Sequence, residues 1–140
     1  MKLFVGMAVL GSLAGAFPLW AHHAFAAEFD VNMPVSVKGT ITKVEWVNPH
    51  AWLYVDVKDA DGKVVNWRFE LGPPNALFRL GWKKDSIAAG TEVAITGFRA
   101  KAQETVANGR SIILPDGREL FSGGSGPGSA GPGPAQNDRK

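Results

Sequence analysis

The fold class follows from the stretch at residues 52–69, which reads WLYVDVKDADGKVVNWRF. Apolar and polar side chains alternate with a period of two on both sides of Asp61-Gly62, a dipeptide typical of tight turns. The pattern predicts an antiparallel hairpin in which Trp52–Val57 pairs with Val64–Phe69. An amphipathic helix is not expected here, because its apolar positions would recur every 3.6 residues.

A long first strand is expected upstream of the hairpin. The alternation runs from Val35 to Ile41, and its phase flips so that Val44 lies on the apolar side. Together with Gly39, the flip predicts a bulge or a sharp coil within this strand. The dipeptide Asn48-Pro49 then ends the strand.

The downstream part adds one short helix and two more strands. Pro73-Pro74 opens a helical stretch that ends at Gly81, and a fourth strand is expected around Val93–Gly97. We expect a turn at Ala107-Asn108-Gly109 and a final strand, itself interrupted by a turn, over Ser111–Phe121. This order predicts a mainly β fold: a small OB-like five-stranded barrel with one short helix between strands 3 and 4. A small open sandwich or roll is the alternative.

The N-terminus has the layout of a secretory signal peptide, which we expect to span residues 1–21. A positive start is followed by Leu3–Phe17, an uncharged run shorter than the roughly 20 apolar residues of a membrane span. The position of Pro18 favours cleavage after Ala21, whereas cleavage after Ala26 is the alternative. We therefore expect export to a bacterial periplasm and no membrane span after cleavage.

The C-terminus is rich in small residues. Nine of the nineteen residues from Ser122 to Lys140 are Gly or Pro, and none is a large apolar residue. Such a segment buries too little surface to offset its ordering entropy. The sequence predicts a β-barrel domain over residues 22–121 and a disordered tail over residues 122–140.

Composition excludes several functional classes. With 15 basic and 13 acidic residues, the formal net charge of +2 creates no strong field for nucleic acid, so we expect no such partner. The absence of Cys excludes disulfides, thiolate metal sites, iron–sulfur clusters and a Cys nucleophile. The chain also has no P-loop, no HExxH and no GxSxG motif, so a binding protein is favoured over an enzyme.

The three histidines, His22, His23 and His50, are the candidate metal ligands. After cleavage at Ala21, His22 offers its α-amine and a ring nitrogen to one ion, and His50 or His23 adds a third nitrogen. Nitrogen donors in a tetragonal arrangement suit Cu(II) first and Zn(II) less, and the arrangement is similar to the histidine brace of secreted copper proteins. The alternative is a solvated histidine pair and a turn histidine packed against tryptophan.

The aromatic residues provide the competing hypothesis. Trp52 and Tyr54 share the strand face opposite Leu53, and Trp67 lies in the next strand. This face predicts a periplasmic binding or accessory module for a small ligand, a glycan or a protein partner. The alternative is that these large side chains serve as core and lid.

Several short motifs occur together in this chain: His22-His23-Ala24-Phe25, Phe29-Asp30, Gly39-Thr40-Ile41, Asn48-Pro49-His50, Gly81-Trp82 and Gly90-Thr91-Glu92-Val93. As a set, they resemble an uncharacterised bacterial family of small exported proteins, known only as a domain of unknown function. The resemblance covers about Ala21 to Leu120. It implies a periplasmic β-rich protein and no established activity, so the functional hypotheses rest on the residues named above.

Overall fold

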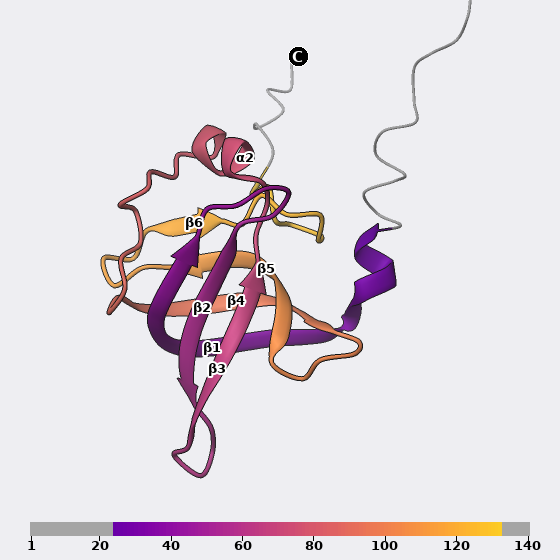
Figure 1. Ribbon diagram of the computed structural model, residues 1–140, viewed down its shortest axis with the longest axis vertical. Helices are drawn as coiled ribbons and strands as arrows, with labels where there is room; N and C mark the ends of the chain where they lie inside the picture. The colour runs from indigo at the N-terminus through magenta and orange to yellow at the C-terminus, as the bar shows by residue number, and fades with distance from the viewer. Residues whose placement is uncertain (1–23, 133–140) are drawn as a thin grey trace, which may run out of the picture.

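The computed structural model describes residues 24–132. A helical segment at residues 24–28 is followed by strands and one further helix (Figure 1). In chain order these are β1 (Phe29–Glu45), β2 (Trp52–Lys58), β3 (Val64–Glu70), α2 (Pro74–Arg79), β4 (Glu92–Ala100), β5 (Val106–Ile113) and β6 (Glu119–Phe121). The expected signal peptide, His22, His23 and residues 133–140 lie outside the described part. No helix within residues 24–132 has the length and apolar character needed to cross a membrane.

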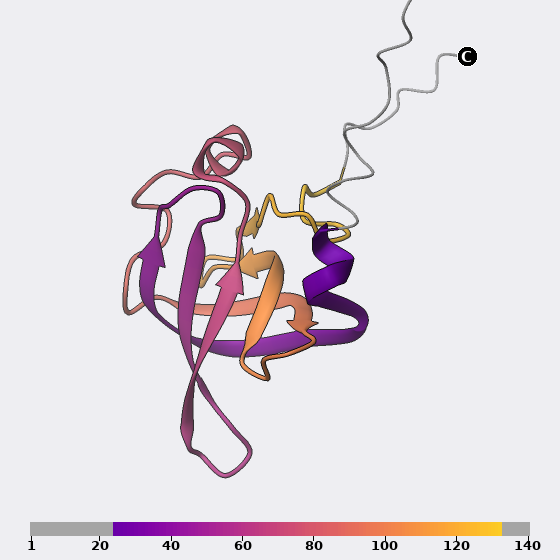
Figure 2. The same ribbon diagram turned by 45° about the vertical axis from the view of Figure 1, so that its right-hand side comes forward.

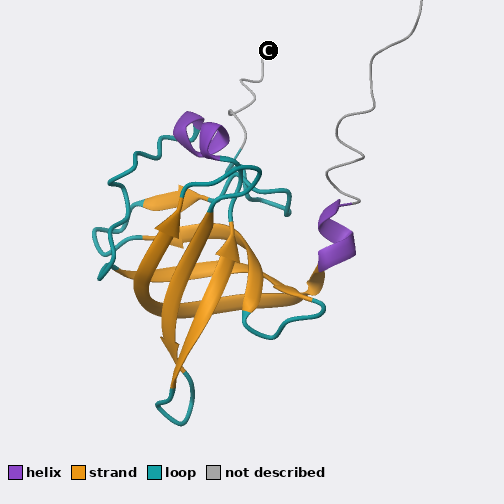
Figure 3. Ribbon diagram, viewed as in Figure 1, coloured by secondary structure: helices purple, strands orange, loops and turns teal. Residues whose placement is uncertain are grey.

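Five strands form a barrel-like ring. The sheet order is β3-β2-β1-β4-β5-β6, and a further pairing of β3 with β5 closes the ring (Figure 3). The closing pair is parallel, from Arg68 opposite Val106 to Glu70 opposite Asn108, whereas the other pairs are antiparallel. The predicted mainly β, OB-like architecture with a short helix after the third strand is confirmed. The turn expected within the final strand separates β5 from β6. β6 is therefore a sixth strand, and it pairs with the end of β5.

The hairpin and the irregular first strand are also confirmed. Strands β2 and β3 pair in continuous register, from Trp52 opposite Glu70 to Lys58 opposite Val64. Gly62 at the turn has a φ of 80°, a conformation that glycine adopts without steric cost. The register of β1 against β2 shifts between Ile41 and Lys43, as expected from the change in phase.

The expected turn at Ala107-Asn108-Gly109 is wrong, because these residues lie inside β5. Asn108 is opposite Phe98 of β4 on one side and Glu70 of β3 on the other, so both edges of the strand are paired. The glycine at position 97 permits this close pairing. A Cβ atom there would lie 2.3 Å from the carbonyl oxygen of Asn108.

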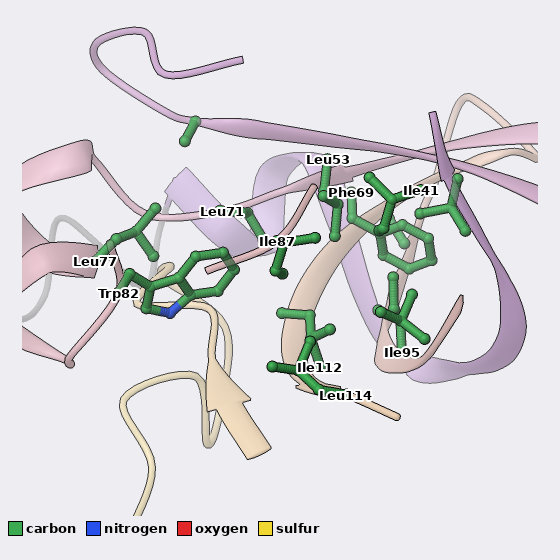
Figure 4. Packing of buried hydrophobic residues seen from close by; sticks show 14 of the residues in the cluster. Ile41, Leu53, Phe69, Leu71, Leu77, Trp82, Ile87, Ile95, Ile112 and Leu114 are labelled. Carbon is green, nitrogen blue, oxygen red and sulfur yellow. The ribbon is translucent and has the colours of Figure 1, made fainter. Parts of the chain in front are cut away.

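The main apolar core fills the ring (Figure 4). Leu53, Phe69 and Ile95 point inward from three different strands, and each is fully buried. Trp82, which follows α2, is buried in the same core, and its Nε1–H donates a hydrogen bond to the carbonyl of Phe121 at 2.8 Å. This core holds β1 to β5 around a common centre, so the outward-facing residues of these strands have fixed positions.

A second, smaller core lies on the outside of the ring. It consists of Phe25, Phe29, Ala100 and Val106, with Trp52 and Phe98 packed against it, and we call it the outer cluster. The ring of Phe25 stacks on that of Phe29 at a centroid distance of 5.6 Å and meets the edge of the Phe98 ring at 5.9 Å. These contacts attach the helical segment 24–28 to the outer face of the strands (Figure 2).

The packed part of the chain extends beyond Phe121, where the flexible tail was expected to begin. Ser122 is fully buried and Ser129 is 3% exposed. The backbone N–H of Gly72 donates to the carbonyl of Ser122 at 2.7 Å, and the Ser122 N–H donates to the carbonyl of Arg110 at 2.9 Å. Small residues allow the segment 122–132 to lie directly on the backbone of neighbouring strands, so its low apolar content does not prevent it from packing.

Candidate functional site

His50 lies in the connection between β1 and β2, directly after a cis peptide bond between Asn48 and Pro49. Its side chain is 42% exposed, and its Nδ1 is 3.3 Å from Oε2 of Glu70 at the end of β3. The next residue, Ala51, exchanges backbone hydrogen bonds with Leu71 and Gly72. The backbone next to His50 is therefore fixed to the chain that follows Glu70.

Glu70 is a buried carboxylic acid, with a side chain only 6% exposed. Burial raises the pKa of Glu70 above its ordinary value, and the nearby charge of Glu28 acts in the same direction. The positive charge of a protonated His50 and the hydrogen bonds from His50 and Asn108 lower this pKa and so oppose the effect of burial. The ionised form of Glu70 therefore depends on the donors that face it.

Asn108 connects this pair to the rest of the fold. It is fully buried, and its Nδ2 donates to Oε1 of Glu70 at 3.3 Å. Its Oδ1 has no hydrogen-bond partner within the described part of the chain. A Cβ atom placed on Gly126 would lie 2.4 Å from this oxygen and 2.9 Å from the ring of Phe25. The outer cluster, the segment after β6 and the His50–Glu70 pair therefore meet around Asn108.

Of the three predicted histidine ligands, only His50 is within the described residues. Among residues 24–132, no group of three or more His, Asp or Glu side chains has the spacing of a metal site.

The His50–Glu70 pair has two chemical capabilities. When protonated, the imidazole forms an ion pair with the carboxylate. When neutral, an imidazole that donates its Nδ1–H to a carboxylate has its lone pair on Nε2 and is oriented as a ligand. Metal-ligating histidines commonly have such a carboxylate on the second ring nitrogen.

The predicted aromatic site is only partly assembled. Trp52 and Tyr54 face outward from β2, and Arg68 of β3 lies opposite Tyr54. Trp67 lies opposite Val55 on the inner side of the hairpin and stacks on Phe69 at 5.9 Å. Trp67 therefore packs against the main core, as its position two residues before Phe69 requires, and the outer face carries Arg68 beside Trp52.

Sequence reasoning missed both Glu70 and Asn108. Glu70 falls on the polar side of an alternating strand, where a charged residue is normally solvated. The predicted hairpin ended at Phe69, whereas in the structure the pairing extends one residue further and places Glu70 opposite Trp52. Asn108 precedes a glycine and so has the appearance of a turn residue.

Comparison of the chain with curated proteins gave no match, and comparison with solved structures gave none either. One family model matches residues 10–109, a range that includes all three histidines, Glu70 and Asn108. Its description is "Family of unknown function", which agrees with the resemblance drawn from the short motifs. Because the match covers most of the chain, this protein belongs to the family of unknown function DUF6152.

Proposed function

We propose that the protein is an exported, periplasmic metal-binding module that takes Cu(II) in preference to Zn(II). The observation that carries the proposal is the contact between Nδ1 of the half-exposed His50 and the buried carboxylate of Glu70, at 3.3 Å. A carboxylate at this nitrogen favours the tautomer with a free lone pair on Nε2 and restricts rotation of the ring. Both effects prepare an imidazole to bind a metal ion.

The remaining donors in this proposal come from the mature N-terminus. Removal of residues 1–21 gives His22 a free α-amine, whose ordinary pKa of about 7.7–8.0 allows it to lose its proton to a metal near neutral pH. The amine and ring nitrogen of His22, the ring of His50 and the ring of His23 form a nitrogen-rich donor set. Such a set favours Cu(II) by geometry and by the general affinity order of divalent ions.

The packing of Phe25 supports the joint use of these donors. Phe25 is 5% exposed as a member of the outer cluster, and both its ring and the side chain of Asn108 approach Gly126. The N-terminal histidines are therefore linked by a very short segment to the neighbourhood of Glu70 and His50. In this role the protein carries or buffers the ion, or delivers it to a periplasmic protein partner.

The test begins with the mass of the N-terminus of the exported protein, which should start at His22. Isothermal titration with Cu(II) then compares this protein with His50→Ala and with a variant that has one extra residue before His22. We expect each change to weaken Cu(II) binding by at least about tenfold, because each removes a donor. Lys63→Ala, in the β2–β3 turn, is the matched control and should bind as the unchanged protein does.

Two results would overturn the proposal. Equal Cu(II) affinity in all four proteins would exclude the histidine site. A mature chain that begins at Ala27 lacks His22 and His23 and would exclude the N-terminal donors.

A further inference from the structure

A pocket of about 370 Å³ lies beside Trp52, between residues 27–29, the outer face of β2 and β3, and the loop after β4. Its volume is within the range of pockets that hold small organic molecules. The apolar part of its lining includes Phe29, Ala100 and Val106 of the outer cluster. The polar residues of the lining are Glu28, Arg68, Lys101 and Gln103.

The charged groups of this pocket favour an anion. Two cations, Arg68 and Lys101, and one carboxylate, Glu28, line it. Within residues 24–132 neither cation belongs to an ion pair. Lys101 donates to the carbonyl of Ala26, a neutral acceptor, so its charge is not compensated by that contact.

Arg68 is oriented for recognition of a planar acid. Its guanidinium lies 5.6 Å from the centre of the Trp52 ring, and its Nη2 donates to Oε1 of Gln103 at 3.0 Å. These two contacts restrict the long side chain, which lowers the entropy lost when a ligand binds. A guanidinium has five N–H donors and binds carboxylates in a bidentate manner.

We propose that this pocket binds a small organic carboxylate whose apolar or aromatic part lies on Phe29, Val106 and Trp52. The carboxylate pairs with Arg68 and is attracted by Lys101, while the apolar part contacts the residues of the outer cluster that line the pocket. The site needs neither the metal ion nor cleavage after Ala21. It also differs from the aromatic face expected from the sequence, because Arg68, and not Trp67, lies beside Trp52 on the outer face.

The experiment uses the full mature chain in EDTA, with phenylacetate as the probe. Two-dimensional NMR follows the indole N–H of Trp52 and the backbone amides of β2 and β3 during the titration. We expect a dissociation constant in the millimolar range, about that of a ligand with ten non-hydrogen atoms. Acetate, which lacks the apolar part, and phenethylamine, which has the opposite charge, should each bind at least about tenfold more weakly.

Variants identify the recognising groups. Arg68→Gln should weaken phenylacetate binding by about tenfold or more, and Lys101→Gln by less, because the lysine acts as a point charge. Arg79→Gln on α2, outside the pocket lining, is the matched control and should leave the affinity unchanged. The Cu(II) affinity of Arg68→Gln should equal that of the unchanged protein, so failure of this site and failure of the histidine site give different results.

Three outcomes would overturn the inference. They are the absence of shifts at about 20 mM phenylacetate, binding of phenethylamine as tight as that of phenylacetate, and unchanged affinity in Arg68→Gln. If Arg68→Gln does not give a folded spectrum, unchanged affinity in Lys101→Gln overturns the inference instead.

Discussion

Truncation of the chain after Phe121 tests whether residues 122–132 stabilise the fold. Composition alone predicts that the residues from Ser122 onward can be removed without effect. In the structure, however, Ser122 is fully buried and bonded to Gly72, which follows β3, and to Gly109 and Arg110 of β5. The informative comparison is between a chain that ends at residue 132 and one that ends at Phe121.

The expected loss can be worked out from the hydrogen bonds that join this segment to the ring. Three are lost on truncation: Gly72 N–H to the Ser122 carbonyl, Ser122 N–H to the Arg110 carbonyl, and Ser122 Oγ–H to the Gly109 carbonyl. At a net contribution of about 1 kcal/mol each, the free energy of unfolding should fall by about 3 kcal/mol. For a domain of this size, that loss lowers the melting temperature by about 12–24 °C.

Thermal unfolding followed by circular dichroism measures this difference directly. The variant Ser122→Ala in the longer chain removes only the hydroxyl, and should cost about 1 kcal/mol. A melting temperature that changes by less than about 2 °C on truncation after Phe121 would refute the reasoning. It would mean that water replaces the lost partners without net cost.

Three further predictions concern the ring and the site. Gly97→Ala places a Cβ 2.3 Å from the Asn108 carbonyl oxygen and should lower the free energy of unfolding by about 1–3 kcal/mol, measured as a lower urea midpoint. An unchanged midpoint would contradict the close pairing of β4 and β5. Glu70→Gln should weaken Cu(II) binding by about 10–100-fold in a competition titration, and equal affinity would show that the carboxylate does not position His50. Because burial raises the pKa of Glu70 above 4.5, the folded protein binds this proton more tightly than the unfolded chain, and stability falls as the pH rises above that value. In EDTA, Glu70→Gln should remove this fall of stability with pH. If the stability of the variant and of the unchanged protein, measured by urea unfolding, had the same pH dependence, the raised pKa of Glu70 would be contradicted.

The sequence predicted those elements whose signal is local. The β2–β3 hairpin follows from alternation around Asp61-Gly62, and the bulge in β1 follows from a change of phase within one strand. The helix α2 follows from Pro74, since proline fits the first turn of a helix but not its interior. In each case neighbours in the chain determine the conformation.

The features that were missed depend on contacts between distant residues. The pair Asn108-Gly109 has a local preference for a turn, but pairing of β5 with both β3 and β4 outweighs it. Glu70 has the pattern of a solvated residue, and only closure of the ring, which pairs Glu70 with Asn108 of β5, shows that it is buried. His50 could be identified as a candidate from its residue type and its place in the Asn48-Pro49-His50 motif. The carboxylate of Glu70 could not, because only the folded chain brings it to His50.

The outer cluster joins two parts of the fold that differ in local stability, namely residues 24–28 and the ring of strands. Phe29 belongs to β1, so Phe25 is the one buried side chain that residues 24–28 contribute to the outer cluster, and its burial contributes only about 1.5–3 kcal/mol. Residues 24–28 can therefore detach while the main core stays intact, and their amides should exchange hydrogen faster than those inside the ring. Any ion held jointly by the N-terminal residues and the ring would then dissociate with this local opening, whose rate is independent of global unfolding.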